Sequence, residues 1–124
     1  MIVVDSSGWV EFLQGTSRAG MFEPALRRLD EVWVPGISLF EVHRLILLKE
    51  SESAADRSIS IMKAAQVVDL DGTLAVEASK VARAHKLSLA DAIIYATAQN
   101  KGAELWTQDA HFEHLPGVKY FPKP

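Results

Sequence analysis

The chain has 124 residues, 48% of them hydrophobic and 23% charged, with a formal net charge of −3 and no cysteine. This composition excludes a disordered tail, a disulfide-stapled scaffold and any zinc site built on thiolates. The negative charge also weighs against an indiscriminate nucleic-acid binder, which is normally basic. We expect residues 1–124 to form a single domain. Because Met1 runs straight into an apolar segment, we expect neither a signal peptide nor a membrane span, and a cytoplasmic location.

Short apolar runs alternate with helical patterns along the whole chain. The strand-like runs are Ile2–Val4, Val32–Val34, Gln66–Leu70, Glu104–Thr107 and Val118–Phe121, and the helical patterns cover residues 9–14, 24–30, 38–50, 54–65, 74–86 and 89–100. Strands rich in Val, Ile and Leu that alternate with helices are typical of an α/β fold in which helices cover both faces of a parallel sheet. Such sheets bind ligands just beyond the carboxyl ends of their strands.

Four acids follow this rule in chain order. Asp5 ends the first strand, Glu41 lies near the start of the helix after the second strand, and Asp109 follows strand 104–107 by two residues. Asp91 lies at the start of helix 89–100, which feeds directly into strand 104–107. Because that helix must end at the amino edge of the sheet, its beginning lies at the carboxyl edge. The sequence therefore predicts that four acids from separate segments converge.

Each acid also has an ordinary structural explanation as a helix cap. Glu41 and Asp91 each follow a serine by three positions, which is the spacing of a capping box. Asp5 and Asp109 are each placed to cap the turn that follows. The capping and metal-binding interpretations are compatible, because a helix N-terminus can hold the backbone while the carboxylate faces an ion.

The surroundings of two acids favour burial over simple capping. Glu41 shares a helical stripe with Ile37, Leu45 and Leu48, which we expect to pack inward, and Asp91 opens a helix that is apolar nearly all round. A cap contributes about 1 kcal/mol. Taking an ionised carboxylate out of water costs several kcal/mol unless it is paired or bound to metal. Because clustered carboxylates bind hard cations without Cys or His, we predict a site for Mg²⁺ or Mn²⁺.

Three further residues are candidate supporting groups for this site. Ser6, like its neighbour Ser7, is placed to orient Asp5, to ligate through water or to touch phosphate, although at least one of the two suits a turn. Thr107 is placed to hydrogen-bond at the site, although a threonine at a strand end is also ordinary. Arg44 is the only basic residue near any of the acids in sequence, and we consider it a candidate phosphate contact. The four histidines show no metal-ligand spacing.

Four ordered motifs give the chain a family resemblance that spans nearly all of its length. The segments are IVVDSSGWVEFL, SLFEVHRLIL, LSLADAIIYATA and WTQDAHFEHLPGVKYF. They resemble the PIN-domain family, and the short chain is most similar to the VapC-type toxins of toxin–antitoxin pairs. By this resemblance Asp5, Glu41, Asp91 and Asp109 take the positions of the family's acidic quartet, and Thr107 matches the hydroxyl residue before the last acid.

The resemblance carries further expectations about fold, activity and partners. It implies a three-layer α/β/α sandwich with a five-stranded parallel sheet, and a single PIN-like domain over residues 1–124. It also implies Mg²⁺- or Mn²⁺-dependent endoribonuclease cleavage of cellular RNA that halts translation, a homodimer, and inhibition by a cognate VapB-like antitoxin. Gly8 departs from the family pattern, because a larger apolar residue is expected there, and such a glycine is expected to loosen the first helix.

Three alternative functions remain open at this point. A housekeeping PIN-fold nuclease acting on RNA or DNA would keep the same metal site and differ only in substrate. A non-catalytic PIN-like binding scaffold would be expected to lack one or more of the four acids, and all four are present. A phosphatase with an aspartyl nucleophile usually has a second Asp two positions after the first, where this chain has Ser7.

Overall fold

Five short parallel strands form the centre of the computed structural model, which describes residues 1–124. They are β1 (Ile2–Val4), β2 (Trp33–Pro35), β3 (Gln66–Val68), β4 (Glu104–Thr107) and β5 (Val118–Tyr120). Strands β1, β4 and β5 pair in the order β1-β4-β5, and β2 pairs with β3. A single parallel bridge between Ile2 and Val32 joins the two groups. The predicted parallel strands are therefore confirmed, but β1 and β2 meet only at their amino ends, so the five strands divide into three and two.

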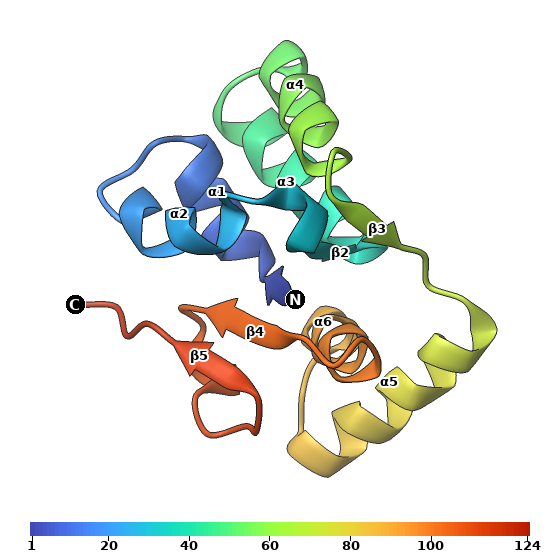
Figure 1. Cartoon of the computed structure of the whole chain (residues 1–124). Coiled ribbons are helices and arrows are strands. Elements are labelled where there is room, and N and C mark those ends of the chain that lie inside the picture. The colour runs from blue at the N-terminus through green and yellow to red at the C-terminus, as the bar shows by residue number, and fades with distance from the viewer.

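Six helices cover these strands on both faces. They are α1 (Ser6–Leu13), α2 (Ala19–Leu26), α3 (Gly36–Lys49), α4 (Glu52–Met62), α5 (Gly72–His85) and α6 (Leu89–Asn100), with 3-10 turns η1 (Leu29–Glu31) and η2 (Ala110–Phe112). Helices α1 to α4 lie on one side of the strands, and α5 and α6 lie on the other side (Figure 1). The predicted α/β/α layering is confirmed.

Two helices begin three or more residues earlier than the sequence pattern predicts. The second begins at Ala19 rather than at residue 24, so Pro24 lies inside it. Proline supplies no backbone N–H, so α2 lacks the helical hydrogen bond from position 24 to the carbonyl of Gly20. The first helix begins at Ser6 rather than at residue 9, because the Asp5 carboxylate accepts a hydrogen bond from the Gly8 N–H and caps it.

The core is built by alternation along β1 and β4. Val4 and Trp106 pack into the cluster shared with α1 to α4. Their neighbours Val3 and Leu105 point to the opposite face and pack against α6. Trp9 on α1 is fully buried in the first of these clusters. This alternation fixes both strands between the helical layers and brings their carboxyl ends to one edge.

Gly8 allows α1 to lie close against the core. A Cβ atom at this position would lie 2.7 Å from Val4 Cγ1 and 2.8 Å from the Phe22 ring. The glycine is therefore a packing requirement, because both neighbours are fully buried and have no free space to move into.

We expect Gly8→Ala to lower the free energy of unfolding by about 1–3 kcal/mol, because overpacking outweighs the gain of up to ~1 kcal/mol in helix propensity. Chemical denaturation measures this change. Gly20→Ala is the matched control, because Gly20 also lies in a helix and a Cβ there would meet nothing within 4 Å. An alanine at position 8 that stabilises the protein as much as one at position 20 would contradict the packing argument.

Candidate metal centre

Asp5 lies at the carboxyl end of β1, where its side chain is almost entirely removed from solvent, at 4% exposure. Its Oδ2 accepts a 2.6 Å hydrogen bond from Thr107 Oγ1, and its Oδ1 accepts from Gly8 N at 3.0 Å and Ser7 Oγ at 3.1 Å. Burial raises the pKa of Asp5 to about 6 even though these hydrogen bonds oppose the shift. No Lys, Arg or His forms an ion pair with this carboxylate, so its charge has no cationic partner in the protein.

Thr107 connects Asp5 to Asp109. Its hydroxyl donates to Asp5 Oδ2 and accepts the backbone N–H of Asp109 at 2.9 Å. Asp109 Oδ1 in turn accepts the His111 N–H at 2.9 Å and so caps the turn η2. The capping prediction for Asp109 is confirmed, and the same threonine fixes both acids at the ends of neighbouring strands.

Asp91 lies in the first turn of α6 and faces Asp109 across the edge of the sheet. Burial raises the pKa of Asp91, and the negative charge of Asp109 adds to the rise. His111 Nδ1 lies 3.3 Å from Asp91 Oδ2 and 3.3 Å from Asp109 Oδ1. One ligand atom from each of these three residues falls within 4.8 Å of the others, so they are placed to hold one cation.

His111 is a candidate ligand that the sequence pattern did not reveal. It stands alone, without a second histidine at metal-ligand spacing, and its side chain is 74% exposed. The one available signal was its place two residues after Asp109, in a turn that Asp109 caps.

Glu41 reaches the site from α3, but not in the way the sequence predicted. The cap of α3 is Pro35, so Ser38 lies inside the helix and the predicted capping box does not form. The fully buried face is Ser38, Val42 and Ile46. Of the predicted stripe, Ile37 and Leu45 are partly buried and pack against the core, whereas Leu48 is 73% exposed. Glu41 is one position away from the fully buried row, about 100° round the helix, and is therefore half-buried. Its Oε1 accepts a 2.6 Å hydrogen bond from Ser6 Oγ, which ties it to the residue after Asp5.

The contacts of Ser6, Arg44 and Ser88 differ from those that the sequence predicts. Ser6 contacts Glu41 rather than Asp5, and it is Ser7 that donates to Asp5. Arg44 lies exposed in a groove between α3 and α4, where Lys63 is a neighbour, and it forms no hydrogen bond or ion pair with any of the four acids. Ser88 is the N-cap of α6, but its side chain makes no capping hydrogen bond.

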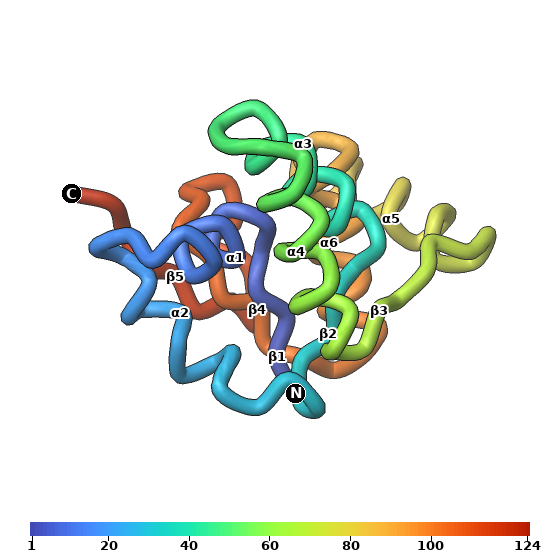
Figure 2. The backbone as a smooth tube through the Cα atoms, turned by 90° about the horizontal axis from the view of Figure 1, so that it is seen from above, coloured from blue at the N-terminus to red at the C-terminus, as the bar shows by residue number.

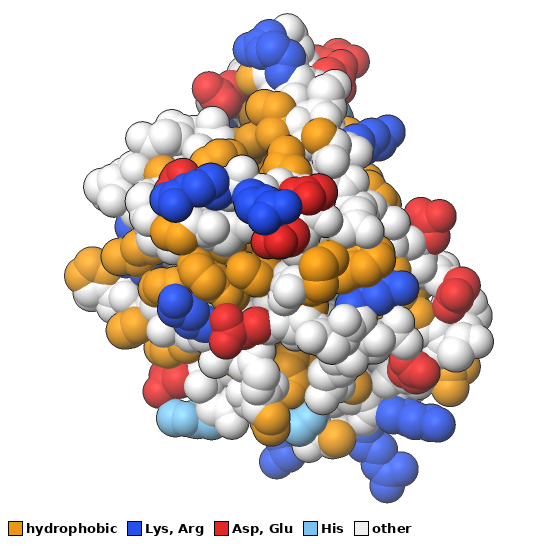
Figure 3. All heavy atoms as spheres, in the orientation of Figure 1, with side chains coloured by type: hydrophobic (Ala, Val, Ile, Leu, Met, Phe, Trp, Pro, Cys, Tyr) orange, Lys and Arg blue, Asp and Glu red, His pale blue; other side chains and the backbone are white.

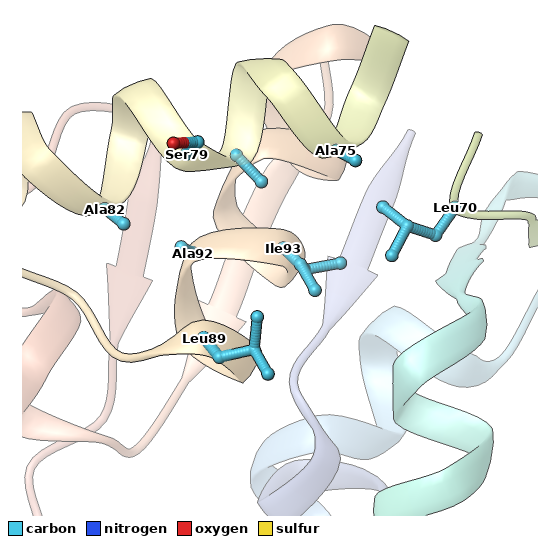
Figure 4. A pocket seen from close by; sticks show the side chains of 8 residues that line it. Leu70, Ala75, Ser79, Ala82, Leu89, Ala92 and Ile93 are labelled. Carbon is cyan, nitrogen blue, oxygen red and sulfur yellow. The ribbon is translucent and has the colours of Figure 1, made fainter. Parts of the chain in front are cut away.

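A cavity that does not include any of the four acids lies between α5 and α6 (Figure 4). Its walls are hydrophobic apart from Ser79, and include Leu70, Leu89 and Ile93. Because no ionisable side chain lines it, this cavity offers no group for acid–base or metal chemistry.

The arrangement at the carboxyl edge suits a hard divalent cation. The carboxylates of Asp91 and Asp109 meet there beside His111, and Asp5 lies next to Asp109, with no Lys or Arg to neutralise them. Oxygen-rich sites of this kind favour Mg²⁺ or Mn²⁺ over softer metals. A parallel α/β/α sandwich with clustered acids at this edge defines a class of candidate metal-dependent enzymes.

Comparison with known families identifies the fold more narrowly. The family model of the PIN domain matches residues 2–118, and the chain therefore belongs to the PIN domain family. A comparison with functionally curated proteins gives no match. None of the helices is both long and apolar enough to cross a lipid bilayer.

Solved structures of similar fold cover nearly the entire chain. A chain of a toxin–antitoxin complex from Klebsiella pneumoniae has a TM-score of 0.82 at 22% identity, covering 99% of this chain and 100% of its own. A VapC toxin of Mycobacterium tuberculosis that cleaves the sarcin–ricin loop has a TM-score of 0.81 at 23% identity, covering 98% and 100%. A chain of DNA-bound VapBC from Salmonella typhimurium has a TM-score of 0.73 at 16% identity, covering 98% and 96%. These similarities establish a common fold.

We expect Thr107→Val to weaken binding of Mn²⁺ by roughly 10- to 100-fold, as is typical when a group that orients a metal ligand is lost. Valine keeps the shape of threonine but neither donates to Asp5 nor accepts from Asp109. Calorimetric titration with Mn²⁺ measures the change. Thr97→Val is the control, because Thr97 is equally buried but its hydroxyl bonds only to the Ile93 carbonyl within α6. Equal affinities for the parent and the position-107 variant would show that the threonine does not order the site.

Proposed function

We propose that this protein is a Mg²⁺- or Mn²⁺-dependent endoribonuclease and the toxin of a toxin–antitoxin pair. Membership of the PIN family supports the nuclease activity. The names of the structural neighbours, a toxin–antitoxin complex and a toxin that cleaves the sarcin–ricin loop, support the biological role. The single observation that carries the proposal is the buried Asp5 carboxylate, which has no cationic partner and lies beside Asp109 at the carboxyl edge.

The residues present fit a divalent ion. Asp91, Asp109 and His111 have ligand atoms close enough together to hold it. Asp5, which lies beside Asp109, and Glu41, which accepts from Ser6, would complete the site. A bound divalent ion would activate a water molecule as the nucleophile and stabilise charge on the phosphate. Thr107 holds the orientation of two of the carboxylates, and Ser6 holds that of Glu41.

The partners follow from the same proposal. The substrate is RNA, and the inhibitor is a cognate VapB-like antitoxin, since several structural neighbours are complexes of this kind, some of them bound to DNA. We also propose that the toxin is a homodimer that acts in the cytoplasm.

Cleavage of labelled single-stranded and structured RNA tests the activity. We expect cleavage with Mn²⁺, none with EDTA, and none with the Asp91→Asn variant. Asp71→Asn is the matched control, because Asp71 caps α5 and asparagine caps a helix equally well. Cleavage that persists in EDTA, or in Asp91→Asn at the parent rate, would contradict the metal mechanism.

Expression in a bacterial host tests the biological role separately. The parent is expected to arrest growth, Asp91→Asn to permit it, and co-expression of the adjacent small gene to restore it. Normal growth with a protein that cleaves RNA in vitro would instead favour a housekeeping nuclease.

A further inference from the structure

We propose that the open cavity next to Asp109 is a nucleotide-binding subsite, in which the Tyr120 ring stacks on a base of single-stranded RNA and Lys123 contacts a phosphate. This inference rests on the proposed ribonuclease function and specifies how the substrate is held beside the metal centre.

The cavity is continuous with the acidic site. It has a volume of about 430 Å³ and is lined by Ser7, Gln108, Asp109, Ala110, Tyr120 and Lys123. Two of these residues belong to the metal centre, since Ser7 donates to Asp5 Oδ1 and Asp109 is a candidate ligand. A group bound in this cavity therefore lies next to the position where the phosphate would react, and the volume is in the range of small-molecule sites.

Strand register directs Tyr120 toward this site. Tyr120 on β5 pairs directly with Thr107 on β4, so their side chains lie on the same face of the sheet. Lys119 pairs with Trp106 and points to the other face, where its ammonium lies 4.1 Å from the centre of the Trp106 indole. The half-buried ring of Tyr120 thus stands on the face where Thr107 holds Asp5.

Arg18 holds the wall of the cavity in place before RNA binds. Its Nη2 donates to the carbonyls of Phe121 at 3.2 Å and Pro122 at 3.4 Å, and its Nε donates to Gln108 Oε1 at 2.6 Å. The C-terminal tail accordingly leaves the fold on the side of α1 and α2 (Figures 1 and 2). Since Arg18 holds the segment just before Lys123, less conformational entropy is lost when RNA binds.

The chemistry of the wall matches single-stranded RNA. Sequence-tolerant binding of single strands combines aromatic stacking with a positively charged groove. The amide of Gln108 is already occupied by Arg18 and by Glu11 Oε2 at 3.0 Å, and Lys123 is the only Lys or Arg that lines the cavity. With a net charge of −3, and with basic and acidic side chains interspersed on the face in Figure 3, general attraction of a polyanion is weak. A single cation beside the acids therefore contributes a large share of the electrostatic attraction between the protein and RNA.

Affinity for RNA tests the stacking contact. Binding is measured with Mn²⁺ in the Asp91→Asn background, so that the RNA stays intact, using an oligonucleotide with fluorescent 2-aminopurine at successive positions. We expect Tyr120→Ala to weaken binding roughly tenfold and to abolish fluorescence quenching at one position, whereas Tyr120→Phe keeps both within twofold. Unchanged affinity and quenching in Tyr120→Ala would overturn the subsite.

Salt dependence tests the phosphate contact. We expect Lys123→Gln to reduce the slope of log affinity against log salt concentration by about 0.7, the value for one phosphate contact on a single strand. Lys119→Gln is the matched control and should leave the slope unchanged, because Lys119 lies over Trp106 on the other face. Equal slopes for the two variants would overturn the assignment.

Cleavage of RNA by the parent with no effect of substitutions at Tyr120 or Lys123 would refute the subsite alone, whereas a parent that neither binds nor cleaves RNA would refute both proposals.

Discussion

Replacing Asp5 with asparagine is expected to abolish RNA cleavage while making the metal-free protein more stable at neutral pH. The loss of cleavage follows from its place beside Asp109 in the acidic site, where Thr107, Ser7 and Gly8 orient its two oxygens. We expect the rate to fall by more than roughly 100-fold, because loss of a direct ligand should exceed the 10- to 100-fold effect typical of supporting groups.

The gain in stability follows from the pKa of Asp5, which burial raises from 3.8 to about 6. The folded protein therefore holds this proton more tightly than the unfolded chain, and folding becomes less favourable as the pH rises from about 4 through 6. At about 1.4 kcal/mol per pKa unit, the ionised carboxylate costs up to about 3 kcal/mol above pH 6. Asparagine removes this penalty and keeps a side-chain oxygen that can accept the Gly8 N–H.

Chemical denaturation of the parent and the variant between pH 4.5 and 7.5, in EDTA, measures this effect. The difference in unfolding free energy between the two proteins isolates Asp5 from every other titrating group. It should be small at pH 4.5 and should grow in favour of the variant up to pH 7. Asp71→Asn is the control, because Asp71 is exposed to solvent and its carboxylate carries no burial cost. A variant at position 5 that is less stable than the parent at pH 7.5 would contradict the burial argument.

The convergence of the acids could be predicted because topology alone determines it. A parallel sheet brings the ends of all its strands to one edge, so an acid at the end of β1 and another two residues after β4 must approach each other. Asp91 could be placed because α6 runs back to the amino end of β4. These inferences need only the alternation of elements, and not the details of side-chain packing.

The sequence-based predictions that were wrong concern contacts between residues that are far apart in the sequence. The buried row of α3 depends on how the helix packs against other elements. Its start at Gly36 was hidden because Pro35, which lacks a capping side chain, precedes it. The role of Gly8 depends on Val4 and Phe22, which lie on separate elements. The bond between Ser6 and Glu41 spans 35 positions in sequence. A single sequence carries no local signal for any of these contacts.

Affinity for Mn²⁺ is expected to fall steeply below pH 6, because both Asp5 and Asp91 must lose a proton to bind the ion. Burial raises the pKa of each, so protons compete with the metal in a range where ordinary carboxylates are already ionised. Affinity should fall by at least roughly tenfold per pH unit below 6, since at least one proton is displaced. In thermal denaturation, Mn²⁺ at 100 times its dissociation constant at pH 7.5 should stabilise the protein by about 2.7 kcal/mol. Near pH 5 the same concentration should stabilise it far less.

His111→Gln separates this explanation from the competing one. Histidine side chains in general gain a proton in the same range, and His111 lies 3.3 Å from both Asp91 and Asp109. If buried carboxylates cause the pH dependence, calorimetric titration of the glutamine variant should show weaker binding overall but the same fall between pH 7 and 5. A profile that becomes flat in this variant would assign the effect to His111. Unchanged affinity of the parent across this range would mean that Asp5 and Asp91 do not bind the ion as carboxylates.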